Sequence, residues 1–175
     1  NGATAVEAGT LKLGVDNALP SGATVVVKVG ATFDLNGKTL ALGGLGGAGA
    51  VANGAGLTIT GAIAPGDSGG VGTLTLAVAP ASLVGAQLAI TVLTNGVSDR
   101  LHVDGDLDLD GMTLVLDDPV PGDQSQPYVV ASCTGALLGE FESVVQQPSK
   151  WRIVYAPESK QVLVDYRRAS MFIMR

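Results

Sequence analysis

Short segments of alternating apolar and polar residues recur along the first two thirds of the chain. Six of them are clear: Leu11-Lys12-Leu13, Phe33-Asp34-Leu35, Leu57-Thr58-Ile59, Leu74-Thr75-Leu76, Leu88-Ala89-Ile90 and Leu107-Asp108-Leu109. Because successive side chains of a strand point to opposite faces, this period of two predicts half-buried β-strands. No long stretch has the apolar period of a helix, so we expect almost no helix.

Turn-forming stretches separate these segments, among them "LPSG", "LNGK", "APGDSGGVG" and "TNGVSD". Successive segments start 22, 24, 17, 14 and 19 residues apart. This spacing is close to one coil of a solenoid, in which each turn stacks only on its neighbours. A β-sandwich gives similar strand and turn signals. The pattern therefore predicts an all-β fold, with a solenoid favoured over residues 1–118.

The composition changes near residue 120, where "DDPVPGDQSQP" forms a connector rich in Pro and Asp. Six of the seven aromatic residues lie beyond it: Tyr128, Phe141, Trp151, Tyr155, Tyr166 and Phe172. A solenoid needs a terminal unit that covers the open end of its core, and large rings bury much apolar area. We therefore expect a β cap or C-terminal extension over residues 119–175. The basic residues near the C-terminus are expected to form its solvated edge.

Composition and charge exclude several classes of function. The 175 residues are 46% apolar and carry a net charge of −6, which disfavours nucleic acid as a partner because phosphate binding needs clustered Lys and Arg. No apolar run approaches the ~20 residues of a membrane span. Cys133 is the single cysteine, so no internal disulfide forms and a buried thiol is expected. The chain opens at Asn1 without a signal peptide, so we expect a mature or excised piece of a longer protein.

Four stretches of the sequence resemble a known repeat. They are "VEAGTLKLG", "LPSGATVVVKVGATFDLNGKTLALGGLGGAGAV", "ITGAIAPGDSGGVGTLTL" and "SDRLHVDGDLDLDGMTLVL". Together, over roughly residues 2–117, they are similar to the autotransporter-associated β-strand repeat of bacterial surface proteins. The resemblance implies a right-handed parallel β-helix that is exported to the cell surface or secreted. It also implies a scaffold, because the family has no catalytic residues to carry over.

The segment Gly66 to Gly70 reads GDSGG, which surrounds the nucleophile of trypsin-like serine proteases. In that interpretation Ser68 needs a histidine base held by a carboxylate. The single histidine is His102, with Asp104 two residues on. In trypsin-like enzymes the histidine and aspartate precede this segment, whereas here both follow it. The order of residues therefore disfavours a working pair of Ser68 and His102.

The same segment contains Asp67-Ser68-Gly69, the short signature of aspartic proteases. Such enzymes bring together two carboxylates that share a proton. With one copy per chain, the site would need a symmetric homodimer, with Leu137-Leu138-Gly139 as a candidate downstream element. The substrate would be an extracellular glycoprotein such as mucin. The third interpretation is a turn, since every residue from Pro65 to Gly70 is a common turn former. We favour the turn.

An acidic row follows in "DGDLDLDGMTLVLD". Asp106, Asp108, Asp110 and Asp117 fit the calcium-loop spacing of an EF-hand, except that the last position is Asp. Leu107 and Leu109 alternate as core residues would, and no flanking helices are expected. On a strand, the four carboxylates of Asp104, Asp106, Asp108 and Asp110 project from one face at ~7 Å intervals. A solvated face and a surface calcium site both remain open.

Taken together, the sequence predicts a secreted or cell-surface stalk that presents or spaces other domains. An aspartic-type peptidase acting through Asp67 in a homodimer is the enzymatic alternative. A second alternative is an adhesin that binds carbohydrate or protein through the solenoid face or the region of Trp151 and Tyr155. Apart from calcium, no cofactor is predicted, and the oligomeric state stays open.

Overall fold

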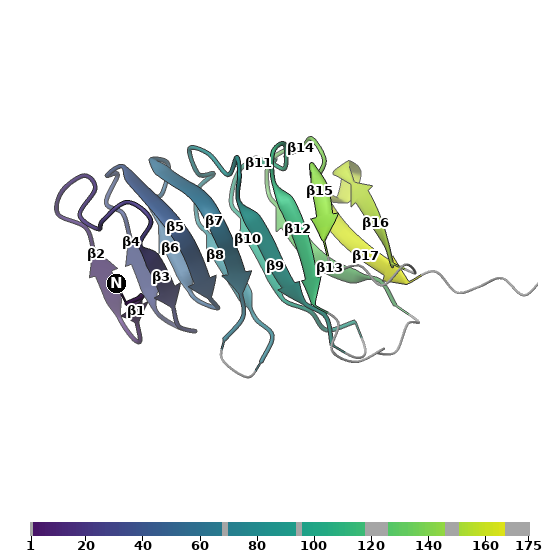
Figure 1. Ribbon diagram of the computed structural model, residues 1–175, viewed down its shortest axis with the longest axis horizontal. Helices are drawn as coiled ribbons and strands as arrows, with labels where there is room; N and C mark the ends of the chain where they lie inside the picture. Colours follow the sequence, from purple (N-terminus) through teal and green to yellow (C-terminus); the bar gives the residue numbers. More distant parts are fainter. Residues whose placement is uncertain (1, 68–69, 94–95, 118–125, 146–150, 167–175) are drawn as a thin grey trace, which may run out of the picture.

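A computed structural model describes residues 2–67, 70–93, 96–117, 126–145 and 151–166. In these ranges the chain is all-β and contains no α-helix, only the single 3₁₀ turn η1 (Pro157–Ser159). The strands form two large sheets and one small sheet (Figure 1). The expectation of an all-β fold is therefore confirmed, and its sheets are largely parallel.

Seven strands form the first large sheet, in the order β1 (Thr4–Val6), β3 (Thr24–Val27), β5 (Leu40–Gly47), β7 (Leu57–Pro65), β9 (Gln87–Thr91), β12 (Thr113–Asp117) and β15 (Ser143–Val145). Every neighbouring pair in it is parallel. Because parallel neighbours need a crossover between them, the chain leaves this sheet after each strand.

Eight strands form the second large sheet, in the order β16 (Trp151–Ala156), β17 (Gln161–Tyr166), β13 (Tyr128–Cys133), β10 (Arg100–Val103), β8 (Thr73–Leu76), β6 (Ala50–Ala52), β4 (Thr32–Asp34) and β2 (Thr10–Lys12). Pairing is parallel from β2 to β13 and antiparallel from β13 through β17 to β16. The small sheet pairs β11 (Leu107–Asp108) with β14 (Leu137–Leu138).

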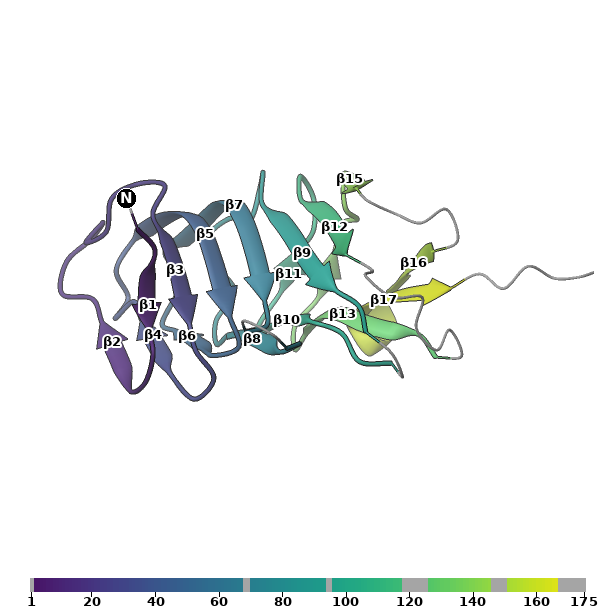
Figure 2. The ribbon, with the colours of Figure 1, turned by 60° about the horizontal axis from the view of Figure 1, so that its bottom comes forward.

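From β1 to β10 the chain alternates between the two large sheets, and after β10 it passes through the small sheet before β12 and again before β15. Figures 1 and 2 show that the pairs of strands follow one another along the long axis of the molecule. The described chain runs from β1 and β2 at one end to β16 and β17 at the other. The division that we predict near residue 118 stays a prediction; parallel pairing runs on beyond it, to β13 and β15.

The core consists mostly of aliphatic side chains, many of which lie opposite one another in register. In the seven-stranded sheet the buried partners are, in order, Val25, Leu45, Ile63, Leu88 and Leu114. In the eight-stranded sheet they are Phe33, Val51, Leu76, Val103 and Cys133. The strands of these two series therefore bury apolar side chains directly against those of their neighbours, which is the unit of stability in a stacked β structure.

Each of the six alternating segments read from the sequence falls on a strand or directly after one. Glycine is required for a steric reason where β7 passes β5 at Gly61. A Cβ atom on Gly61 would lie 1.8 Å from the carbonyl oxygen of Gly43, because β5 and β7 approach closely at this point. Only glycine allows that approach.

Aromatic rings pack at the C-terminal end of the described chain. Tyr128 and Trp151 contact each other edge to face, with ring centroids 5.7 Å apart, and both are buried. Phe141 and Tyr155 pack with centroids 6.3 Å apart, and the Phe141 amide donates to the Tyr155 hydroxyl at 3.1 Å. Burial raises the pKa of Tyr155. Each ring buries a large apolar area at this end of the core.

In the part of the chain that the structure describes, no helix has the length and apolarity that crossing a bilayer requires.

The aliphatic register makes a prediction about stability. Leu88 is fully buried between Ile63 and Leu114, so Leu88→Ala should lower the free energy of unfolding by about 3 kcal/mol, through lost transfer energy and a cavity. Val84→Ala is the matched control, since Val84 is 64% exposed, and should cost less than about 0.5 kcal/mol. Urea unfolding followed by circular dichroism measures both. Equal costs would contradict the buried register.

Candidate functional site

The GDSGG segment begins a closed turn at the end of β7. Gly66 has φ +102°, a conformation that favours glycine. The Asp67 amide donates to the Gly70 carbonyl at 3.1 Å, and the Gly70 amide donates back to the Asp67 carbonyl at 2.9 Å. Ser68 and Gly69 lie outside the described residues. The backbone around Asp67 is thus that of a turn between strands.

The carboxylate of Asp67 forms an ion pair with the Lys28 ammonium group. Lys28 follows β3, so the contact joins the turn after β7 to a segment 39 residues earlier. Its hydrogen bond to Asp67 raises the pKa of the Lys28 ammonium group. The ion pair gives Asp67 a clear structural role, because it fixes the turn against the neighbouring connection.

A second carboxylate, that of Asp99, is buried beside this turn and is only 4% exposed. Asp67 and Asp99 both line one pocket of ≈ 330 Å³. Asp99 Oδ1 accepts the amide of Gly72 at 2.9 Å, and Oδ2 accepts the amide of Thr91 at 3.0 Å. Because both oxygens bind backbone amides, Asp99 ties the start of β8 to the end of β9. Sequence reasoning missed Asp99, because the only signal there is the polar pair "SD" directly before β10.

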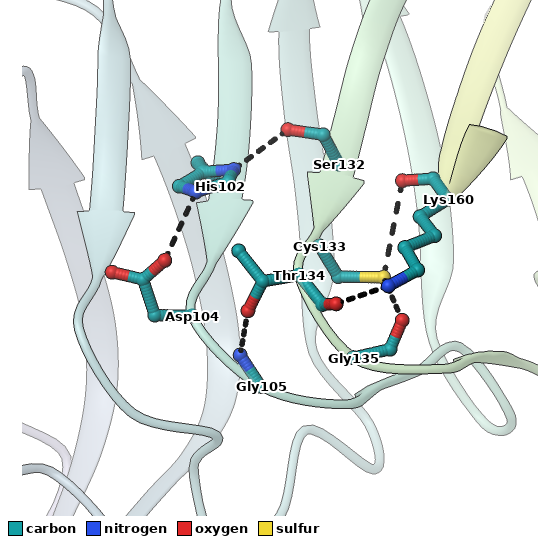
Figure 3. Close-up of polar contacts among 8 residues, drawn as sticks. All are labelled: His102, Asp104, Gly105, Ser132, Cys133, Thr134, Gly135 and Lys160. Atoms are coloured by element: carbon teal, nitrogen blue, oxygen red, sulfur yellow. Dashed lines mark hydrogen bonds and ion pairs between the residues drawn. The ribbon is translucent and has the colours of Figure 1, made fainter.

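His102 lies on the outer face of β10, between a hydroxyl and a carboxylate (Figure 3). Its Nδ1 is 2.8 Å from Ser132 Oγ, and its Nε2 is 3.3 Å from Asp104 Oδ1. The serine-type interpretation of the sequence placed His102 between Ser68 and Asp104. In the structure, the imidazole contacts the carboxylate of Asp104 and the hydroxyl of Ser132. Sequence reasoning missed Ser132 because 30 residues separate it from His102.

Close to His102 and Ser132, the end of β13 is held by further polar contacts (Figure 3). The Thr134 hydroxyl accepts the Gly105 amide at 2.9 Å. The Cys133 thiol lies 3.7 Å from the Gly135 carbonyl oxygen and 3.8 Å from that of Lys160. Burial raises the pKa of the Cys133 thiol, so its reactive thiolate form is disfavoured. Cys133 is thus a buried core residue, as its lone occurrence predicted.

The acidic row runs from the end of β10 along β11, the first strand of the small sheet. Leu107 and Leu109 are fully buried, which confirms that they are core residues, while the aspartate between them and those on either side are exposed. Asp106 Oδ1 accepts the Ala136 amide at 2.7 Å, and Asp110 Oδ1 accepts the Glu140 amide at 3.3 Å. These carboxylates therefore bind backbone amides on either side of β14.

Asp108 Oδ1 accepts the amide of Asp110 at 3.0 Å. A pocket of ≈ 240 Å³ is lined by Asp106, Asp108, Asp110 and residues 79–84. Among the described residues, no three His, Cys, Asp or Glu side chains are grouped to hold a metal ion. The calcium site over Asp104, Asp106, Asp108 and Asp110 stays a prediction.

The remaining candidate positions lie on or beside β14 and on β16. Leu137 and Leu138 form β14, paired with β11, and Gly139 follows with φ +63°. Trp151 is buried against Tyr128, so the ring that the adhesin alternative would use lies in the core. Tyr155 is partly buried beside Phe141.

No protein-family model matches this chain, and a comparison with curated proteins finds no significant match. The resemblance to the autotransporter-associated repeat therefore stays a prediction.

The turn interpretation of GDSGG makes a prediction about Asp67→Asn. This variant removes the charge that pairs with Lys28, so it should lower the melting temperature slightly, as Lys28→Gln should. The purified wild-type chain should leave casein and mucin intact from acidic to neutral pH, and both variants should do the same. Wild-type cleavage that Asp67→Asn abolishes and Lys28→Gln retains would instead establish the aspartic-type peptidase.

The calcium prediction expects a rise in melting temperature in millimolar calcium chloride, because a ligand that binds only the folded state stabilises it. A chelator should reverse the rise, and Asp108→Asn should abolish it. Magnesium chloride at the same ionic strength controls for screening. A melting temperature that responds equally to both salts would leave a solvated acidic face.

Proposed function

We propose that the chain is a right-handed parallel β-helix that serves as a structural stalk, secreted or displayed on a cell surface, and that it spaces or presents other domains. The observation that carries this proposal is the continuous register of buried aliphatic residues along both large sheets. In such a stack, the stability is the sum over neighbouring coils, so length can be gained without a larger core.

Further observations support a parallel β-helix. The chain moves between the two large sheets with parallel pairing on both, as successive coils of a β-helix require. Crossovers between parallel strands of one sheet are right-handed in nearly all proteins, because a right-twisted strand packs back only that way. The repeat resemblance in the sequence implies the same hand.

The arrangement of the ends supports a spacer. β1 and β2 lie at one end of the long axis, and β16 and β17 lie at the other (Figure 1). At the second end, the antiparallel strands β17 and β16 follow the parallel strands, and the rings of Tyr128 and Trp151 fill the core. A molecule with this arrangement holds whatever is joined to its two ends at a fixed separation.

A distance measurement tests the stalk. Spin labels are introduced at Val15→Cys, just after β2, and at Glu158→Cys, in η1 between β16 and β17, in a Cys133→Ala background; both positions are exposed. Double electron–electron resonance should give a single narrow distance distribution, because the labels are joined by a continuous stack. Leu88→Ala in the same background is the control that weakens the middle of the stack. A broad distribution without that substitution would contradict a stiff spacer.

Localisation is tested separately, by antibody labelling of intact and permeabilised cells that produce the protein. A displayed or secreted stalk should be labelled on intact cells or found in the medium. Labelling only after permeabilisation would contradict it.

A further inference from the structure

His102 and Ser132 lie side by side on the outer face of the eight-stranded sheet. Their strands, β10 and β13, pair in parallel, with His102 opposite Ser132. The next residues along each strand, Val103 and Cys133, point into the core. Because the period of a strand is two, the register that aligns the core also aligns the imidazole with the hydroxyl.

The hydrogen bonds of the ring define its tautomer. A carboxylate only accepts hydrogen bonds, so in the neutral imidazole Nε2 carries the proton and donates it to Asp104 Oδ1 at 3.3 Å. Nδ1 then has a free lone pair and accepts the hydroxyl of Ser132, whose Oγ is 2.8 Å away. This is the arrangement of a nucleophile, a base and an orienting carboxylate.

The three side chains differ in exposure in a way that suits this chemistry. Ser132 is 8% exposed, whereas the side chains of His102 and Asp104 are 30% and 48% exposed. Ser132 is therefore largely buried, while the imidazole that contacts its hydroxyl is more exposed to solvent. β10 lies inside the sheet, between β8 and β13, and strands position reactive groups more accurately than loops do.

We propose that Ser132, His102 and Asp104 form an acyl-transfer site that accepts small activated esters. The low exposure of Ser132 favours a small acyl group. Ser132 Oγ attacks the ester carbonyl and forms a new carbon–oxygen bond, while its proton passes to His102 Nδ1. The bond to the alcohol breaks, the departing oxygen takes that proton, and the acyl group stays on Ser132. Water then repeats the sequence and releases the acid.

In this proposal Ser132 is the nucleophile and His102 is the base. Asp104 is a positioning residue, because it acts on the ester only through the ring. It follows β10 two residues after His102, so both side chains leave the strand on the same face. The proposal is independent of the stalk function, since a scaffold of stacked strands can carry such a site on its outer face.

The test incubates the full chain with p-nitrophenyl acetate, and peptide mass spectrometry then locates the acetyl group. Acetylation should occur on Ser132 and disappear in Ser132→Ala. His102→Gln should slow it about 100-fold, the usual contribution of a general base. Asp104→Asn should slow it less than His102→Gln does, because the contact to Asp104 is long and half-exposed, and Asp104→Glu should restore part of the rate.

Ser143 provides the matched control. Its hydroxyl also faces a neighbouring strand, 2.9 Å from Thr113 Oγ1, but that neighbour is a hydroxyl instead of an imidazole. Ser143 should stay unmodified, and Ser143→Ala should leave the rate on Ser132 unchanged. Circular dichroism verifies that each variant is folded. A folded chain without acetyl on Ser132, or a rate on Ser132 that His102→Gln leaves unchanged, would overturn the proposal and leave a row of structural hydrogen bonds.

Discussion

The structure depends on the register between parallel strands. Because Leu45 lies opposite Val25 and Ile63, its aliphatic side chain is covered on both sides by equivalent ones, and most of the core needs no ring. A shift of one residue in any strand would turn its buried side chains outward and its polar ones inward. The same register orders the outer faces, so it also decides which polar side chains meet.

Because the register orders both the core and the outer faces, only the local part of the structure could be predicted from the sequence. Alternation placed Leu74, Leu88 and Leu107 on strands, and the turn formers around Asp67 gave the turn, because both signals are local. Contacts between segments far apart in the sequence were beyond such reasoning. Lys28 pairs with Asp67, and Ser132 meets His102, only because connections of unequal length bring those strands into line.

The acidic side chains show the same limit from another direction. In the sequence, Asp106 and Asp110 form a row of like charges that suggests a cation. In the structure, their oxygens accept amides on either side of β14, and buried Asp99 does the same for β8 and β9. Short acidic side chains thus satisfy the backbone where the chain passes between sheets, as buried or strained turns require. Their spacing alone could not distinguish these roles.

The order of the strands along the long axis has a mechanical consequence. Hydrogen bonds between neighbouring strands run across the strands, and therefore roughly along the direction in which the strands succeed one another (Figure 1). A pull on the two ends loads successive pairings in series, so that they open one after another from an end. Such a molecule yields gradually under tension, losing one strand pairing at a time while the remainder keeps its fold.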